Sequence, residues 1–151
     1  MTNEELKQSL TENFTGTQFE DGGEWVCMPV DEPQWRETAG RLKSFSSLDF
    51  DYLFCLTCID WKTHFTMVYH FSSTKYRHTL VVKVKLDRNA PSIETVSDLW
   101  RTAEFHEREV YDLFGVQFRN HPDLRRLFMT DEWIGWPLRK DYEDPVNMIK
   151  L

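Results

Sequence analysis

The middle of the chain carries the clearest hydrophobic pattern, and this pattern predicts β-structure. From 50 to 59 the residues are almost continuously apolar, which is typical of a strand buried on both faces. Residues 64–71 and 79–87 alternate instead between apolar and polar positions, so each run turns one side to a core and one to water. A short polar loop joins the two alternating runs, which together predict an antiparallel hairpin with one solvated face.

The first third of the chain predicts two helices with a strand between them. Residues 3–15 have a short amphipathic pattern. Pro33 suits the first turn of a second helix, which we expect to continue to Phe45. The apolar stripe of this second helix is thin, so we expect the helix to cover one face of a sheet. Between them, residues 24–30 alternate weakly and predict a strand that ends near Pro29.

Residues 95–115 have the most regular helical pattern in the chain. Thr95 and Asp98 have the spacing of a capping box, and Gly115 supplies a left-handed stop. One face of the expected helix carries a mostly apolar stripe, formed by Leu99, Ala103, His106, Val110 and Leu113. Another face carries charges of alternating sign at four-residue spacing, at Glu104, Arg108 and Asp112.

The regular pattern is lost after residue 120. A short helix is expected to begin at Pro122, with apolar and basic sides formed by Leu124, Leu127, Phe128, Arg125 and Arg126. The chain beyond it is apolar but aperiodic, and Gly135, Pro137 and Pro145 interrupt any regular element. Such a tail either wraps its own domain or lies in a groove of another protein, and two tryptophans in an extended segment favour the partner. On that interpretation, removing residues 131–151 leaves the β-domain folded.

These elements predict the α+β fold class. We expect a mainly antiparallel sheet of about four strands, flanked by helices and followed by an extended C-terminal tail. A length of 151 residues favours one domain. We place this domain at residues 1–119, and residues 120–151 form a C-terminal extension expected to dock on partner subunits.

The acidic composition excludes two classes of partner. Lys plus Arg is 18 and Asp plus Glu is 25, which gives a formal net charge of −7. Nucleic acids and anionic lipid surfaces attract positive fields, so neither is an expected partner. No apolar run approaches the roughly 20 residues that a spanning helix needs, so direct membrane insertion is not expected either. The polar N-terminus does not resemble a signal peptide, which indicates a cytoplasmic protein that a partner can still hold at a membrane.

The three cysteines do not indicate a metal site. Cys27, Cys55 and Cys58 cannot all pair with each other, which fits a reducing compartment. The Cys-Leu-Thr-Cys spacing lies within an expected strand, where residues three apart point to opposite faces. We therefore expect buried strand cysteines and no bound metal or cluster.

The histidines and carboxylates do not form a recognisable catalytic set. The sequence from His106 begins like the zinc-protease motif, but Val110 stands where the second histidine is required. His64 and His70 share a strand face, yet six residues separate them by about 20 Å. An acid–base site is conceivable among four carboxylates, Glu107, Glu109, Asp112 and Asp123, although a helix rich in Glu and Arg is more often a salt-bridged face. We expect no catalytic, cofactor-binding or metal-binding residues in this chain.

Residues 107–142 contain three motifs at fixed spacing. A Glu-Arg-Glu helix end continues into Tyr-Asp-Leu-Phe-Gly, followed by a His-Pro-Asp-Leu-Arg-Arg turn and then by Pro-Leu-Arg-Lys-Asp-Tyr. This combination closely resembles the signature of the C subunit of respiratory complex I, the NuoC-type or 30 kDa subunit of proton-pumping NADH:quinone oxidoreductase. The resemblance makes the following positions the expected signature and partner-interface residues: Glu107, Arg108, Glu109, Tyr111, Asp112, Gly115, His121, Pro122, Asp123, Arg125, Arg126, Trp133, Trp136, Pro137, Leu138, Arg139, Lys140, Asp141 and Tyr142.

The resemblance implies a structural role within a hetero-oligomer. The D subunit is the main expected partner, its chain sometimes being fused to the C subunit, and the B and I subunits are the others. No cofactor is expected in this chain, whereas FMN and iron–sulfur clusters are expected in partner subunits. The chain would help to build the hydrophilic arm that passes electrons from NADH to quinone. Its expected place is the cytoplasmic side of the bacterial inner membrane, where the complex holds it peripherally.

Two departures from the family pattern leave the electron donor open. Many relatives have a histidine where this chain has Trp136, and the Asp-Glu-Trp-Ile-Gly segment at 131–135 differs from mitochondrial-type members. Similar short chains occur in membrane-bound [NiFe] hydrogenases and in complexes that oxidise F420H2 or ferredoxin, so an equivalent subunit of such a complex is the alternative. A stand-alone metal-dependent hydrolase that uses His106 and the carboxylates is a third hypothesis.

Overall fold

The computed structural model describes residues 1–21 and 23–149. In chain order its elements are α1 (Asn3–Asn13), β1 (Val26–Val30), α2 (Glu32–Ser44), β2 (Tyr52–Asp60), β3 (His64–Ser72), β4 (Thr79–Asp87), β5 (Ser92–Glu94), α3 (Ala103–Phe114) and β6 (Gln117–Arg119). Strands β1 to β4 form one sheet in the order β1-β4-β3-β2, in which only the β1–β4 pair is parallel. Strands β5 and β6 form a separate parallel pair. The predicted α+β fold with a mainly antiparallel sheet of four strands is confirmed.

The first two helices begin and end close to their predicted limits. A capping box starts α1, in which the Thr2 hydroxyl accepts from the Glu5 N–H and the Glu5 carboxylate accepts from the Thr2 N–H. Helix α2 has a proline in its first turn, as expected, and buries a narrow stripe against the sheet, formed by Trp35, Thr38, Ala39 and Leu42. The short amphipathic patterns in the sequence were therefore sufficient to place both helices.

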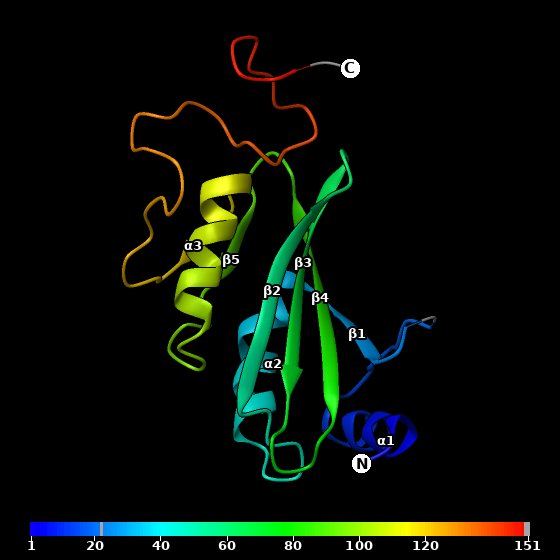
Figure 1. The fold of residues 1–151 in the computed structure, drawn as a ribbon. Coiled ribbons are helices and arrows are strands. Elements are labelled where there is room, and N and C mark those ends of the chain that lie inside the picture. The colour runs from blue at the N-terminus through cyan, green and yellow to red at the C-terminus, as the bar shows by residue number, and fades with distance from the viewer. Residues whose placement is uncertain (22, 150–151) are drawn as a thin grey trace.

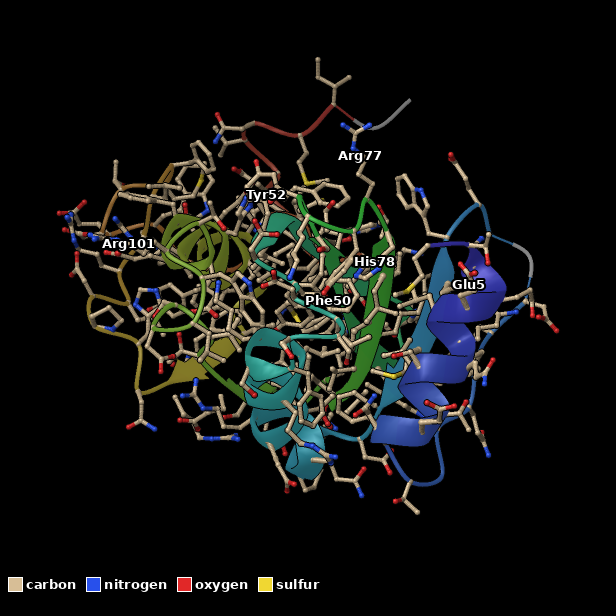
Figure 2. All side chains as sticks on the ribbon, turned by 90° about the horizontal axis from the view of Figure 1, so that it is seen from below. Glu5, Phe50, Tyr52, Arg77, His78 and Arg101 are labelled. Carbon is tan, nitrogen blue, oxygen red and sulfur yellow. The ribbon has the colours of Figure 1, made fainter. Side chains whose placement is uncertain are left out.

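All three helices contribute to one core with the inward-facing side chains of the sheet. Figure 1 shows α3 beside β2 and α1 beside β1, so these two helices lie at opposite edges of the sheet. Figure 2 shows the same separation, with Arg101 just before α3 and Glu5 on α1 at opposite ends of the view. Phe50 and His78 lie between them, with ring centroids 4.8 Å apart. The expected antiparallel hairpin is present as β3 and β4.

Strand β2 is not buried on both faces, contrary to the expectation for the apolar run at 50–59. It is the edge strand of the sheet, and Tyr52 and Thr57 are exposed. A β-bulge shifts the register between Leu53 and Cys55, so successive apolar residues do not simply alternate between the two faces. A continuous apolar run gives no information about which strand lies at the centre of a sheet. The inner strands are β3 and β4, where Val68 and Val81 are buried even on the side away from the helices.

Helix α3 begins at Ala103, so residues 95–102 are not helical as predicted. The two side chains expected to cap the helix have partners elsewhere. The Thr95 hydroxyl donates to the Glu107 carboxylate, and the Asp98 carboxylate accepts two hydrogen bonds from the Arg36 guanidinium, at 2.7 and 2.6 Å. The expected charge ladder is also wrong, because Arg108 and Asp112 are buried and bind residues beyond the helix.

The end of α3 is as predicted, whereas the helix expected at Pro122 is not present. Gly115 has a left-handed backbone with φ of 77°, and its N–H donates to the Tyr111 carbonyl at 2.8 Å. Residues 120–149 form turns and irregular backbone without a helix. Gly115 also lies against the indole of Trp136, such that a Cβ atom at this position would be 2.5 Å from the ring.

Replacing Gly115 by alanine tests both constraints at this position. We expect Gly115→Ala to lower the free energy of unfolding by about 2–3 kcal/mol, because a left-handed alanine costs about 1–2 kcal/mol and the Trp136 ring must also move. Gly16 is a matched control, since it has the same φ of 77° but a Cβ atom added there would have no neighbour within 4 Å. Urea denaturation of both variants measures the difference. Equal losses in Gly115→Ala and Gly16→Ala would show that the Trp136 contact contributes nothing.

Candidate functional site

The three sequence motifs lie together on α3 and on the segment that follows it. We define residues 121–142 as the strap. Figure 1 shows the first part of the strap running in irregular turns alongside α3, on the far side of the helix from the central sheet, before the chain crosses over the end of the helix toward the sheet. The strap has almost no regular secondary structure, so its path depends on side-chain contacts with α3 and with the sheet.

The carboxylate of Asp112 fixes the beginning of the strap. Its Oδ2 atom accepts hydrogen bonds from the backbone N–H groups of Leu127, Phe128 and Met129, at 3.1, 2.6 and 3.0 Å. Its Oδ1 atom accepts from the Arg126 guanidinium at 3.0 Å. Burial raises the pKa of this carboxyl, but the amide and guanidinium donors outweigh burial and hold the pKa below its ordinary value. Asp112 is therefore a buried anion whose acceptor sites are filled by its own chain.

The guanidinium of Arg126 continues the same network into the strap. It donates to the backbone carbonyls of Asp112, Trp133 and Gly135, each at 3.0 Å. It also lies 4.5 Å above the centroid of the Trp136 ring. A planar group with five N–H donors suits this position, because it can bind a helix end and two points of the strap at once.

Arg108 provides a second attachment one turn earlier on α3. Its guanidinium donates to the carbonyls of Arg125 and Arg126, at 3.2 and 3.1 Å. The sequence left open whether Arg108 and Arg126 pair within the chain or across an interface. Both are engaged within the chain.

The strap also completes the C-terminal end of α3. A helix leaves its last four carbonyls without partners inside the helix. Here the Tyr111 carbonyl accepts from the Gly115 N–H, and the Asp112 carbonyl accepts from the Arg126 guanidinium. The Leu113 carbonyl accepts from the Leu138 N–H, and the Phe114 carbonyl accepts from the Arg139 guanidinium. The Leu138 bond to the Leu113 carbonyl is 3.0 Å and the Arg139 bond to the Phe114 carbonyl is 2.7 Å. Two cationic side chains at the negative end of the helix dipole add to this stabilisation.

The far end of the strap is attached to the sheet. The buried Asp60 carboxylate, at the end of β2, accepts from the Lys140 N–H at 2.9 Å and from Arg88 at 2.9 Å. Arg88 also pairs with Asp141 at 2.9 Å. The Arg88 guanidinium, together with the Lys140 and Lys62 N–H groups, holds the pKa of Asp60 well below its usual range. Asp60 and Arg88 are functional anchors that sequence reasoning missed, because they lie outside the motifs and nothing in the local pattern marks them.

Glu107 forms a separate buried polar cluster on the inner side of α3. Its carboxylate accepts from the Thr95 hydroxyl and from the Val96 N–H, and one oxygen lies 3.6 Å from Nε2 of the buried His121 ring. Burial raises the pKa of the Glu107 carboxyl to about 7, although the two hydrogen bonds oppose this shift. Glu107 has no exposed surface. It therefore joins three segments of the fold and does not face a substrate site.

The fold does not bring the acid–base candidates Glu107, Asp112 and Asp123 together into one reactive group. Glu107 and Asp112 are separately buried, each with partners from the chain itself, while Asp123 is exposed and pairs with Arg125. Within residues 1–21 and 23–149 there is no group of three or more His, Cys, Asp or Glu side chains placed to hold a metal ion. Burial raises the pKa of the Cys58 thiol to about 12, so this cysteine is protonated near neutral pH.

An open hollow of the described structure lies away from the motifs. It is an open groove of about 910 Å³ between the segment after α1, strand β1, helix α2 and the ends of β3 and β4. Its lining includes Lys83, which pairs with Glu20, and Arg41, which donates to the Asn13 carbonyl. None of the motif residues lines it.

The strap answers the question that the sequence left open about the tail. The tail was expected either to wrap its own domain or to lie in a groove of another protein. Residues 126–141 wrap their own domain, and Trp136 packs against Tyr111 with ring centroids 5.5 Å apart. The expectation that the tail lies mainly in a partner's groove was wrong for this part. Residues 150 and 151 of the predicted extension lie outside the described residues, and docking of the extension on partner subunits stays a prediction.

Comparison with known proteins identifies what the chain resembles. The family model described as "Respiratory-chain NADH dehydrogenase, 30 Kd subunit" matches residues 28–146. Over 142 residues, 90% of this chain and 89% of the relative, it is 39% identical to the C subunit of F(420)H(2) dehydrogenase of Methanosarcina mazei. It is 40% identical over 111 residues to the C subunit of NADH-quinone oxidoreductase of Chloroherpeton thalassium, and 44% identical over 112 residues to the C/D subunit of NADH-quinone oxidoreductase of Phocaeicola vulgatus.

These matches differ in how much of each protein they cover. The aligned region is 72% of this chain and 46% of the Chloroherpeton protein, and 73% of this chain and 22% of the Phocaeicola protein. The chain thus spans less than half the length of these two curated relatives.

Two solved structures have the same fold. The trypsin-resistant fragment (1–134) of Nqo5 is 31% identical, with a TM-score of 0.70 over 79% of this chain and 98% of that chain. A chain of the archaeal membrane-bound sulfane sulfur reductase, a respiratory membrane complex, is 24% identical with a TM-score of 0.80 over 93% of this chain and 85% of that chain. Among the described residues, no helix is long and apolar enough to cross a membrane.

Truncation tests whether the strap is part of the domain. A chain that ends at residue 130 loses the acceptors of Arg126 at 133 and 135 and the caps of α3 at 138 and 139, so we expect unfolding free energy to fall by about 3 kcal/mol or more. The expectation that the β-domain stays folded without residues 131–151 did not include this loss of stability. A chain that ends at Tyr142 keeps these contacts and is the control. Equal thermal stability of both truncated chains would contradict the attachment.

Glu107 makes stability depend on pH. Its pKa is higher in the folded chain, at about 7, than its ordinary value of 4.5, so folding takes up a proton between these values. The stabilisation is therefore complete below about pH 4.5 and is lost as the pH rises through 7, with a size of up to about 3 kcal/mol. The Glu107→Gln variant lacks the titrating carboxyl, so its stability should not show this loss as the pH rises through 7. Urea denaturation of both proteins from pH 4.5 to 8 measures it, and parallel curves would show that Glu107 does not titrate in this range.

Proposed function

Since this chain belongs to the family of the 30 kDa subunit of respiratory-chain NADH dehydrogenase, we propose that it is the structural C subunit of a proton-pumping NADH:quinone oxidoreductase, or complex I. In this role it helps to build the hydrophilic arm through which electrons pass from NADH to quinone. The family match is the observation that carries the proposal, because residues 28–146 include most of the sheet, helix α3 and the complete strap.

The geometry of the motifs supports a structural role. The charged side chains of Asp112, Arg108 and Arg126 bind groups within the chain. Side chains that are fixed in this way hold the shape of the domain. We therefore propose that the redox chemistry, with FMN and the iron–sulfur clusters, belongs to partner subunits and that this chain binds no cofactor.

The proposed partner subunits follow from the proposal that this chain is the C subunit of complex I. We propose the D subunit as the main neighbour, with the B and I subunits as further contacts. The assembly would lie at the cytoplasmic side of the bacterial inner membrane and would hold this chain there as a peripheral subunit. Relatives named as single subunits of larger oxidoreductases support assembly into a hetero-oligomer.

One observation favours a second candidate. The F(420)H(2) dehydrogenase relative from Methanosarcina mazei aligns over nearly the whole of both chains, whereas the Chloroherpeton relative is more than twice as long as the aligned region. The alternative is therefore the equivalent subunit of a complex that takes electrons from F420H2, ferredoxin or hydrogen. In either complex the chain itself has the same structural role, and only the subunits that receive electrons differ.

Native isolation of the complex tests the proposal. A tagged chain purified under mild detergent should bring the D, B and I subunits in equal stoichiometry, together with the flavin-bearing subunits that oxidise NADH. Subunits that oxidise F420H2 or hydrogen in their place would select the second candidate. The chain purified alone should contain neither flavin nor metal. A chain that is monomeric in native extracts, or that turns over a substrate unaided, would overturn both candidates and favour a stand-alone enzyme.

A further inference from the structure

The outer side of α3 and the strap expose four large apolar side chains. The exposed fractions are 58% for Phe105, 62% for Phe128, 91% for Ile134 and 53% for Leu138. We define these four residues as the apolar ridge. Isolated apolar side chains are common on protein surfaces, but several on one rigid support indicate an interaction site. Only Leu138 was among the interface residues that the sequence motifs suggested.

The contacts of the strap place the members of the ridge along one helix. Phe105 lies on α3, where the Arg108 guanidinium stacks on its ring at 5.4 Å. The backbone of Phe128 is bound to Asp112, and that of Leu138 to Leu113. From 105 to 113 the helix rises about 12 Å, so these attachment points fit within the centre of an ordinary protein interface.

The backbone of Ile134 is held through its two neighbours. The carbonyls on either side of it, of Trp133 and Gly135, both accept hydrogen bonds from Arg126. This arrangement ties the backbone down at two points and leaves the Ile134 side chain almost fully exposed. The ridge is thus organised before any partner binds, which lowers the entropy lost on association.

The charged and apolar residues of the motif region have opposite roles. Buried charges such as Asp112 and Arg126 fix the shape of the strap from within, and the ridge is the apolar part of an outer surface that also exposes charged side chains such as Lys140. Interface centres are typically poor in charge and rich in aromatic and aliphatic side chains, as the ridge is. Asp131 and Glu132 are exposed just before Trp133 and add negative charge close to Ile134 in the chain. A complementary partner surface is apolar at its centre and basic at this edge.

The protein seated on this surface can be identified from the relatives. In Phocaeicola vulgatus the matching region is 22% of one longer chain named as the C/D subunit, so the C and D subunits are covalently joined there. A partner joined in this way must lie close to this domain. We propose that the apolar ridge is the docking surface for the D subunit, an inference that rests on the proposed function.

A double variant tests the ridge while every hydrogen bond of the anchors stays in place, although it removes the contact of the Arg108 guanidinium with the Phe105 ring. We expect Phe105→Ser combined with Ile134→Ser to weaken binding of the full-length chain to the co-expressed D subunit by roughly 30-fold or more, as removal of interface anchors does. Both side chains are exposed, so the thermal stability of the isolated chain should not fall. Trp61→Ser is the control, because Trp61 is exposed to a similar extent, 53%, but lies in the turn between β2 and β3, where its indole donates to Thr66.

The outcomes separate this inference from the proposed function. Affinity for the D subunit that is unchanged in the double variant, or reduced equally by Trp61→Ser, overturns the ridge as the docking surface while the function stands. Loss of the B or I subunit with normal retention of the D subunit overturns the choice of partner. An unaltered chain that binds no subunit of the complex overturns the proposed function and the inference together. Loss of binding to the D subunit in the double variant alone supports both.

Discussion

The carboxylate of Asp112 is the point on which the arrangement of the C-terminal half depends. It is fully buried, accepts three consecutive backbone N–H groups of the strap and pairs with Arg126. A buried ion pair is stabilising only when its remaining hydrogen-bonding capacity is also satisfied, and here both partners meet that condition. Removing either group would leave the other as an unpaired buried charge, which typically costs about 3–5 kcal/mol. An aperiodic segment is thereby held as firmly as a helix.

This constraint determines which residues face outward. Because Asp112, Arg126 and Asp60 bind groups within the chain, their charges do not reach the surface, where apolar side chains such as Phe128 and Ile134 are exposed among polar ones. A region that is dense in Glu, Asp, His and Arg in the sequence thus also exposes several large apolar side chains in the fold. This feature accords with the structural role proposed for the chain within a multi-subunit complex.

Local patterns predicted the elements whose stability is local. Helices α1 and α2, the β3–β4 hairpin and the left-handed end at Gly115 follow from spacing, capping and glycine alone. Predictions failed where distant partners override such signals: Thr95 binds Glu107 and Asp98 binds Arg36, so the capping box expected there does not form. The strap could not be predicted because its contacts join residues that are 14 to 80 positions apart, which leaves no period in the sequence. The motifs mark the region where these contacts converge, but they could not tell anchoring residues from exposed ones.

The most direct test of this account is amide hydrogen exchange of the isolated chain, without any partner subunit. If Asp112 and Arg126 fix the strap within its own domain, the amides of Leu127, Phe128 and Met129 should be protected to a degree comparable with the amides in the middle of α3. The amide of Leu138, which caps the helix, should show similar protection. Exchange of these amides at the rates of an unstructured peptide would contradict the account, because the strap would then acquire its shape only within the complex.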